Sequence, residues 1–352
     1  MFLTACSAND GGTSSGEAGG ASSDEDVTET EDDGVYESAL EVVSLNSDGE
    51  NFVFVMGENE EIYVDTGSEI FSILNYLPES YSTMRNPFVS DGTVYFISTD
   101  ENNSDVILSV DINNLSEATV ISEAREIIYS FTVKNGVLYY FTYDDDTYRF
   151  YENELDGKDK KLFKTDDYVS NFFVSSLYIV YGNFIYDIDK DKLTVLCDDV
   201  PEDAVGIGVE DGLYYYYTAD GASDTLTVYY IQITSLEIAS VFESEIGFSA
   251  PRLYDGKIVC ATANSNAMEY VEILAYDVAG EMTSISSTDG YYYEDLYEKI
   301  GNYDAVYVDG SYYVYYPETV SCYEAESETE YLFTTSPENA WVTYDEYLEY
   351  SE

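Results

Sequence analysis

Histidine is absent from this sequence of 352 residues, and basic residues are scarce. Without histidine the chain cannot itself supply a Ser-His-Asp or Cys-His catalytic arrangement, or a histidine-ligated zinc site. Its 13 lysines and arginines stand against 71 aspartates and glutamates, which gives a formal net charge of −58. Such a surface repels phosphate backbones, so nucleic acid is excluded as a partner. The charge serves solubility, or alternatively attracts cations or basic partners.

Long apolar runs and close cysteine pairs are also missing. No segment approaches the ~20 apolar residues that a membrane-spanning helix needs. Beyond Cys6, the cysteines Cys197, Cys260 and Cys322 are too far apart for a CxxC-type metal site. We expect them to be buried as small apolar residues on strands.

The N-terminus carries the tetrapeptide Leu3-Thr4-Ala5-Cys6, followed by a polar segment. It resembles the lipobox of bacterial lipoproteins, which implies a lipidated (diacylglyceryl or palmitate) Cys6. The protein would then lie on the extracellular face of the cell membrane, in a Gram-positive bacterium, and touch the membrane only through this anchor. The basic and apolar parts of a signal peptide do not precede the motif. In the alternative interpretation, Cys6 is an ordinary residue of a disordered N-terminus.

Composition divides the chain into four segments. Residues 1–6 are the lipobox, and residues 7–35 form a Gly-, Ser- and acid-rich linker that buries nothing and is expected to be disordered. Residues 36–337 hold the folded domain. Residues 338–352 form a tail in which Trp341, Tyr344, Tyr347 and Leu348 have helical spacing, so we expect a short helix packed on the domain.

Tight-turn dipeptides recur along the folded domain before strand-like runs of tyrosine, phenylalanine and valine. Asp-Gly and Asn-Gly supply the positive φ angles of two-residue hairpins. Asp48, Asp91 and Asn135, which open the first three, are 43 and 44 residues apart. Asp211 and Asp255 are again 44 residues apart, and 76 residues separate Asn135 from Asp211, which predicts a hidden turn near Val174–Leu177.

Periods of ~40 residues with four short strands are typical of propeller blades. The sequence therefore predicts an all-β fold, a seven-bladed β-propeller of four-stranded antiparallel blades, with six blades as the alternative. The predicted inner strands are residues 39–45, 86–89, 127–133, 169–174, 205–209, 247–253 and 303–308. A helical insertion is predicted at residues 291–300.

The third unit contains Arg149-Phe150-Tyr151-Glu152-Asn153-Glu154-Leu155-Asp156-Gly157 and then Lys160-Lys161-Leu162-Phe163. This strand–turn–strand pattern resembles that of YWTD-like and TolB-like propellers and of a group of bacterial lipoprotein propellers. The YWTD tetrapeptide itself is absent. The resemblance covers residues 36–337 at the level of repeat phase. It supports the fold and implies no activity.

The predicted function is a surface-anchored, non-catalytic binding or scaffold module for a cell-surface protein or glycan. The alternative is a carboxylate-dependent glycan hydrolase, which needs two facing acids in a deep central funnel. The candidate ligand-binding rim lies on the loops between second and third strands. Its acidic residues are Asp100, Glu101, Asp144, Asp145, Asp146, Asp220 and Asp224.

No cofactor is expected, with calcium as the possible exception. Asp187-Ile188-Asp189-Lys190-Asp191 has the alternating carboxylates of a calcium loop, but Lys192 stands where that loop needs glycine. A hairpin turn is the favoured interpretation of this segment.

Overall fold

The structure is a computed structural model. It describes residues 45–56, 61–169, 171–201, 204–220, 225–245, 251–254, 256–263, 271–277, 282–286, 304–308, 311–316, 319–324, 329–335, 339–343 and 346–347. The chain separates into two compact units, residues 1–40 and 41–352, and all described residues belong to the second. No helix in the described part of the chain is long and apolar enough to cross a membrane.

The described strands form seven antiparallel sheets, each made of strands that follow one another in the chain. Blade one contains β1 (Leu45–Ser47), β2 (Phe52–Met56), β3 (Glu61–Asp65) and β4 (Ile70–Ser72). Blade two contains β5 (Arg85–Ser90), β6 (Thr93–Thr99), β7 (Asp105–Asp111) and β8 (Thr119–Ala124). Blade three contains β9 (Ile127–Lys134), β10 (Val137–Asp144), β11 (Thr147–Asn153) and β12 (Asp159–Thr165). Two short 3-10 helices, η1 (Ile73–Tyr76) and η2 (Ile112–Asn114), follow β4 and β7.

The remaining sheets continue the same order. Blade four contains β13 (Phe173–Val174), β14 (Tyr178–Tyr181), β15 (Phe184–Asp187) and β16 (Lys192–Val195). Blade five contains β17 (Val205–Glu210), β18 (Leu213–Asp220), β19 (Thr225–Gln232) and β20 (Ile238–Glu245). Blade six contains β21 (Arg252–Tyr254), β22 (Lys257–Ala263), β23 (Val271–Asp277) and β24 (Met282–Ser286). Blade seven contains β25 (Asp304–Val308), β26 (Ser311–Tyr316), β27 (Thr319–Glu324), β28 (Thr329–Thr334) and β29 (Ala340–Val342).

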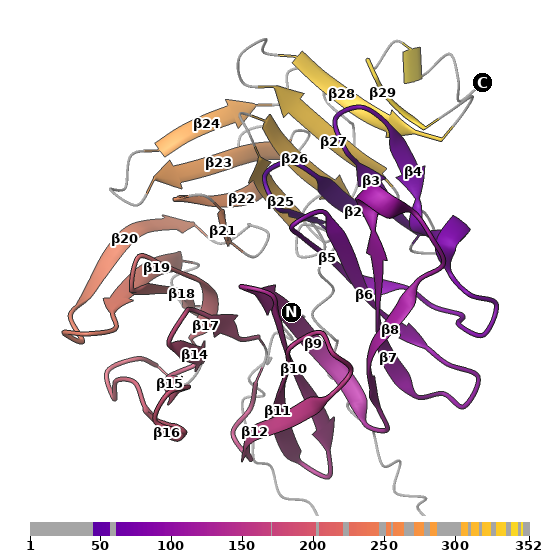
Figure 1. Cartoon of the computed structure of the whole chain (residues 1–352). Helices are drawn as coiled ribbons and strands as arrows, with labels where there is room; N and C mark the ends of the chain where they lie inside the picture. Colours follow the sequence, from indigo (N-terminus) through magenta and orange to yellow (C-terminus); the bar gives the residue numbers. More distant parts are fainter. Residues whose placement is uncertain are drawn as a thin grey trace, which may run out of the picture. The chain divides into compact units, whose positions relative to one another are not determined.

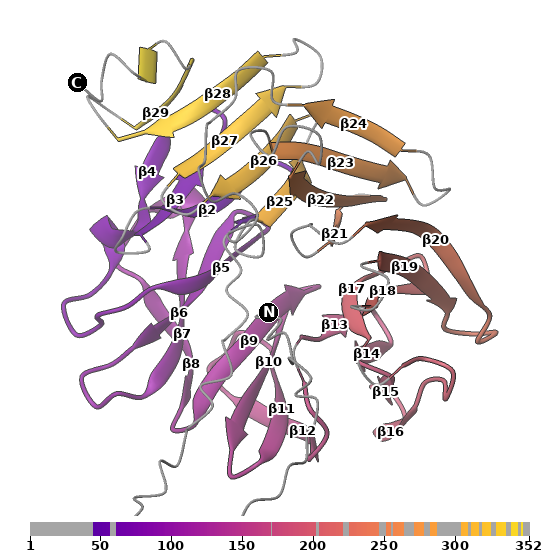
Figure 2. The same ribbon diagram turned by 180° about the vertical axis from the view of Figure 1, so that it is seen from behind.

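The sheets are arranged as blades around a central axis, with the first strand of each on the inside (Figures 1 and 2). Successive first strands contact one another from β1 to β25, and β25 contacts β1, which closes the ring. These contacts confirm an all-β propeller of four-stranded antiparallel blades. Six sheets have four strands, and blade seven adds the fifth strand β29.

The turn dipeptides behave as the sequence predicts. Asp91 and Gly92 have φ angles of 50° and 70°, and Asp211 and Gly212 have 49° and 78°. Both pairs join a first strand to a second, so they lie at the same end of their blades, which we call the turn face. The hidden turn of blade four is there too: the Ser175 hydroxyl accepts the N–H groups of Leu177 (3.4 Å) and Tyr178 (3.1 Å). Asp255 and the Asp309-Gly310 turn lie outside the described residues.

Side chains near the axis join neighbouring blades through backbone groups. Asp48 accepts a hydrogen bond from the N–H of Gly92 in the next turn, at 3.0 Å. The Asn86 amide donates to the carbonyl oxygen of Tyr129 at 3.2 Å. These pairs are 44 and 43 residues apart, which is the repeat period. The repeat spacing therefore reflects a direct contact between adjacent blades as well as equal blade lengths.

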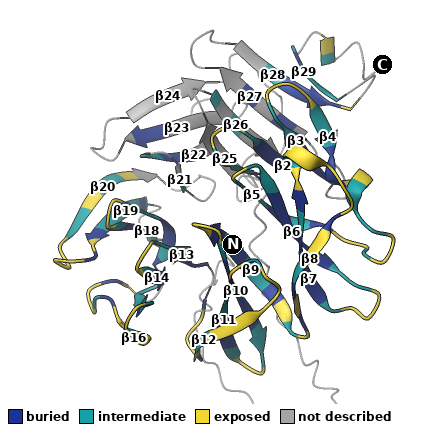
Figure 3. Ribbon diagram, in the orientation of Figure 1, coloured by how far each residue is buried: buried dark blue, intermediate teal, exposed yellow. Residues whose placement is uncertain are grey.

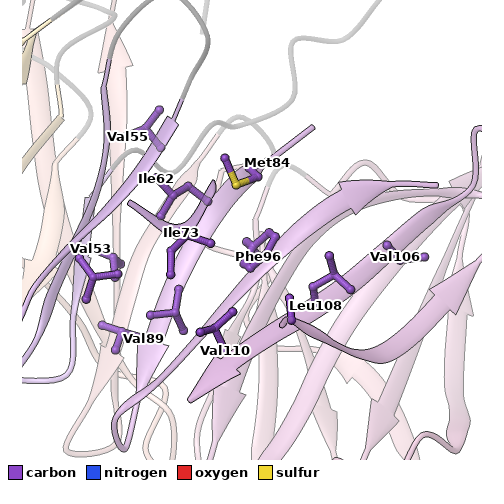
Figure 4. Close-up of a cluster of buried hydrophobic side chains, with 13 residues drawn as sticks. Val53, Val55, Ile62, Ile73, Met84, Val89, Phe96, Val106, Leu108 and Val110 are labelled. Atoms are coloured by element: carbon purple, nitrogen blue, oxygen red, sulfur yellow. The ribbon is translucent and has the colours of Figure 1, made fainter. Parts of the chain in front are cut away.

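Buried residues lie along the strands of the blades (Figure 3), and their apolar side chains form clusters between adjacent sheets. Between blades one and two the cluster contains Val53 of β2, Val89 of β5 and Phe96 of β6, each of which is at most 2 % exposed (Figure 4). Alternating strand positions point to the two faces of a sheet. In β6, Val94 and Phe96 belong to the cluster shared with blade one, and Tyr95 and Ile97 to the cluster shared with blade three, so blade two is apolar on both faces.

Blades one and seven close the ring through side chains, because no described strand is exchanged between their sheets. Phe54 of β2 packs against Phe333 of β28, with ring centroids 4.8 Å apart. The indole N–H of Trp341 in β29 donates to the Asp65 carboxylate at 2.7 Å. This junction is a packed interface between the two ends of the repeat.

Some predicted boundaries differ from the structure. The first inner strand, predicted at residues 39–45, runs to Ser47, and β13 contains only Phe173–Val174 where residues 169–174 were predicted. Asn171 instead donates its side-chain amide to the carbonyl oxygen of Gly206 at 2.7 Å. Polar side chains that bond backbone groups compete with regular strands. The predicted insertion at residues 291–300 lies outside the described residues.

The predicted helical tail is only partly helical. Trp341 belongs to strand β29, which pairs with β28 and was not predicted. A helical turn follows, because the Tyr347 N–H donates to the carbonyl oxygen of Thr343 at 2.9 Å. The Glu346 carboxylate accepts the N–H of Thr343 at 3.0 Å, as in a capping box.

Candidate ligand-binding funnel

Blade four is the shortest blade, and a cavity of about 690 Å³ opens beside it. Its inner strand β13 has 2 residues and β14 has 4. The inner strands of its neighbours are longer, with 8 residues in β9 and 6 in β17. Because the neighbouring blades extend further than blade four, their ends form the walls of this cavity. We call it the funnel.

The funnel is lined by inner strands and turns of blades three to six. Its lining residues are Lys134, Asn135, Phe173, Val174, Ser175, Ser176, Ile207, Gly208, Val209, Glu210, Asp211, Gly212 and Leu253. Asn135, Ser176 and Gly212 belong to turns between first and second strands, so the funnel opens on the turn face. The lining combines polar and charged groups near the turns with apolar side chains deeper along the strands, and a cavity of about 690 Å³ has the size of a small-ligand site.

The charged groups of the funnel lie on different blades. Lys134 ends β9 on blade three, is exposed, and forms no ion pair within the described residues. Glu210 and Asp211 lie together at the end of β17 on blade five. The Glu210 carboxylate accepts the N–H of Gly256 at 3.0 Å, which holds it in place. The funnel therefore separates a cationic wall from an acidic one.

Closely packed residues lie behind Phe173 of the funnel lining. Tyr214 of β18 is fully buried, and no hydrogen bond of its hydroxyl is found among the described residues. Burial, with Tyr216 adding to it, raises the pKa of this phenol far above its usual value. A Cβ on Gly206 would come within 2.5 Å of that hydroxyl and 2.7 Å of the Phe173 ring. Glycine at this position therefore allows Phe173 and Tyr214 to pack closely against β17.

The acidic rim predicted from the sequence lies at the opposite end of the blades, and Asp100, Asp144 and Asp146 interact with groups of their own hairpins. Asp100 accepts the N–H groups of Asn102 and Ser104, each at 2.8 Å. The hydrogen bond from the N–H of Ser104, ahead of those from Asn102, lowers the pKa of Asp100 below its usual value. Glu101 is an exposed residue of the same turn. This part of the rim is a hydrogen-bonded hairpin connection.

The tip of blade three has a similar role. Asp144 lies 3.5 Å from the Arg149 guanidinium, and Asp145 and Asp146 have φ angles of 49° and 57°. Aspartate tolerates this left-handed conformation better than most residues. Asp220 is the last residue of β18, and Asp224 lies outside the described residues. The structure does not bring the rim acids of different blades together in a described site.

The calcium-like segment forms the turn between β15 and β16. Asp187 accepts the backbone N–H of Lys190 at 2.9 Å and its ammonium at 2.6 Å. Within the described residues no cluster of three or more acids and cysteines could hold a metal ion. Cys260, on β22, is buried, and burial raises the pKa of its thiol to about 12.

No protein-family model matches the chain, and no curated protein matches it in sequence. Its fold is similar to that of several solved propellers. The propeller domain of the Trilobed protease from Pyrococcus furiosus, described as having an open velcro topology, is 15% identical. Its TM-score is 0.55, and the match covers 86% of this chain and 97% of that one.

Peptidases provide further structural neighbours. A structure from a study of two prolyl endopeptidases is 12% identical, with a TM-score of 0.58 and coverage of 83% of this chain and 49% of that chain. An acylaminoacyl peptidase is 13% identical, with a TM-score of 0.57 and coverage of 88% and 53%. The chain thus spans about half the length of these enzymes. At such identities the similarity establishes the propeller fold alone.

Proposed function

We propose that this chain is a non-catalytic binding propeller whose ligand binds in the funnel on the turn face. The observation that carries the proposal is the cavity beside the shortened blade four. Phe173 of its lining packs closely against Gly206, and the lining carries Lys134 and Glu210 on different blades. A preformed cavity costs a ligand little reorganisation on binding. The peptidase propellers with the same fold make a peptide or protein ligand reasonable here.

The glycan-hydrolase alternative receives less support from the funnel. Hydrolysis of a glycosidic bond needs two carboxylates that flank the sugar from opposite sides. The acids in the described lining, Glu210 and Asp211, are adjacent residues on one blade, and Glu210 holds the N–H of Gly256. This arrangement favours binding over glycoside hydrolysis.

One substitution tests the location of the site. Ser176 is exposed at the edge of the funnel, so Ser176→Trp is expected to fill the opening with little effect on folding. Ser116→Trp, at an exposed serine outside the lining, is the matched control. The full-length chain would be applied to arrays of random peptides and of glycans. Ser176→Trp should no longer bind the array ligands that the wild-type protein binds, and Ser116→Trp should still bind them. Equal binding by both variants contradicts the proposal.

We also propose that Cys6 is lipidated and holds the protein on the extracellular face of the membrane, as its lipobox-like context suggests. Two acyl chains would give stable anchoring. In a Gram-positive host, the full-length gene product should enter the detergent phase, and Cys6→Ala should release it to the medium. Equal partitioning of the two proteins contradicts this anchor.

A further inference from the structure

We propose that the funnel binds a short basic peptide in an extended conformation, added as a strand to the free edge of β17, with its C-terminal carboxylate at Lys134. This inference rests on the proposed function and specifies its ligand. It depends on the unpaired edge of β17, on the room left by blade four and on the separated charges of the two walls.

The edge of β17 is available to a ligand backbone. β17 is the first strand of its sheet and pairs with β18 alone among the described strands. Four consecutive residues of it, Ile207–Glu210, line the cavity. The Asn171 amide already occupies the carbonyl of Gly206, so one end of this edge is closed. An extended peptide that pairs with an exposed sheet edge gains backbone hydrogen bonds regardless of its sequence.

Blade four leaves the space that such a strand needs. The inner strand β13 has 2 residues and contacts both β9 and β17, so a full-length β13 would occupy the same region. The side chains of Val174, Ile207 and Leu253 supply apolar surface for alternate residues of a peptide. Phe173 is the lone aromatic residue in the lining and is half-buried. This wall suits aliphatic side chains better than stacked sugar rings.

The charges set the direction and the net charge of the peptide. Lys134 is the one cation of the lining, exposed and without an ion pair in the described part of the chain, so it can hold a terminal carboxylate. The −58 charge of the chain repels ligands of net negative charge and attracts basic ones. A peptide with lysines along its body and a free carboxylate at its end meets both conditions.

The test uses the full-length chain and an N-acetylated pentapeptide of sequence Ala-Lys-Val-Lys-Val, as the C-terminal acid and as the amide. By calorimetry the acid should bind wild type about tenfold or more tightly than the amide, since a hydrogen bond to a charged group is lost. Lys134→Gln should remove this preference, and Lys134→Arg should retain it. Lys192→Gln, at an exposed lysine of β16 on the outer edge of blade four, should behave as wild type.

N-methylation of single peptide amides tests the strand addition. A strand pairs with one neighbour through every second residue, so methylation should weaken binding at alternate positions only. Equal affinity of acid and amide, a preference that survives Lys134→Gln, a uniform effect of methylation, or no binding of the acid at all would each overturn the inference. If an array ligand is lost from Ser176→Trp while the peptide fails, the proposed funnel stands and only its ligand class is wrong. If the peptide binds Ser176→Trp as it binds wild type, the funnel itself is wrong.

Discussion

Blades three and four have the same order of four strands and adjacent places in the ring, yet they differ in length throughout. The strands of blade three have 7 or 8 residues, and those of blade four have 2 or 4. Aromatic side chains pack between the two blades. Phe163 of β12 in blade three and Tyr186 of β15 in blade four have ring centroids 4.5 Å apart. The comparison teaches that packing between blades preserves the ring when a blade is shortened. The shortened blade then leaves the funnel.

The largest effect should come from the aromatic contact that joins these two blades. Phe150 is 1 % exposed and packs on Phe163 and Tyr181, with centroids 4.4 and 5.4 Å away. Phe150→Ala should lower the free energy of unfolding by about 3–5 kcal/mol, because it opens a cavity between full sheets. Phe184→Ala, at a half-buried position of blade four, should cost less than about 2 kcal/mol. Urea unfolding measures both, and equal losses would contradict the greater importance of blade three.

A second prediction concerns the layer behind the funnel. Gly206→Ala should destabilise the chain by about 1–3 kcal/mol, because its Cβ would overlap the Tyr214 hydroxyl and the Phe173 ring. Tyr214→Phe should have little effect by itself, since it removes a buried hydroxyl for which the described residues provide no hydrogen bond. The double variant should recover part of the loss. Additive effects in this double-mutant cycle would show that the two groups do not meet.

The turn of blade four also differs from the turns of the regular blades. In blade four the Ser175 hydroxyl accepts a hydrogen bond from Tyr178 in its own turn. In blade one, by contrast, the Asp48 carboxylate accepts a hydrogen bond from the N–H of Gly92, which belongs to blade two. Burial acts to raise the pKa of Asp48, but hydrogen bonds from the N–H groups of Gly92, Asn51 and Glu50 outweigh it, and the pKa falls below 3.8. A lowered pKa means that the carboxylate stabilises the fold above pH 3.8, and that this contribution is lost as the pH falls through the folded-state value.

Asp48→Asn should therefore cost on the order of 1 kcal/mol at pH 6, and this difference from wild type should shrink as the pH approaches 3. Denaturant unfolding at a series of pH values measures it. Glu50→Gln, at an exposed neighbour, is the control. A loss that stays constant with pH would mean that the charge of Asp48 does not contribute.

The smallest effect is expected at the tip of blade three. The triple substitution Asp144→Asn, Asp145→Asn and Asp146→Asn should change stability by less than about 0.5 kcal/mol, because asparagine also tolerates positive φ. If the rim binds a cation or a basic partner, as its charge suggests, the triple variant should lose that binding and its salt dependence. Binding in the funnel should be unchanged. A loss of funnel ligands in this variant would move the site to the rim.

Local chemistry explains which parts of the fold the sequence predicts. Asp-Gly and Asn-Gly turns depend on the φ angles of two residues, so Asp91, Asn135 and Asp211 are predicted correctly, and their spacing identifies the blades. Strand β29 was missed, because its pairing with β28 depends on a contact that no periodicity records.

The funnel could not be predicted, because it arises from what blade four lacks. The sequence shows that the 76 residues between Asn135 and Asp211 hold two units, and that these units are shorter than the others. It does not show which of their strands are shortened. One signal was present. Lys134 precedes the Asn135-Gly136 turn in a chain with only 13 basic residues. The clustered acids favoured the rim as the predicted site instead, whereas Asp100, Asp144 and Asp146 interact with groups of their own hairpins.

The most direct test of the funnel is hydrogen exchange on the full-length chain with and without the pentapeptide acid. The account predicts slower exchange in Val205–Glu210 and in residues 173–176, with no change in residues 100–104 and 144–147. Protection confined to the rim segments, with exchange in β17 unaltered, would contradict it.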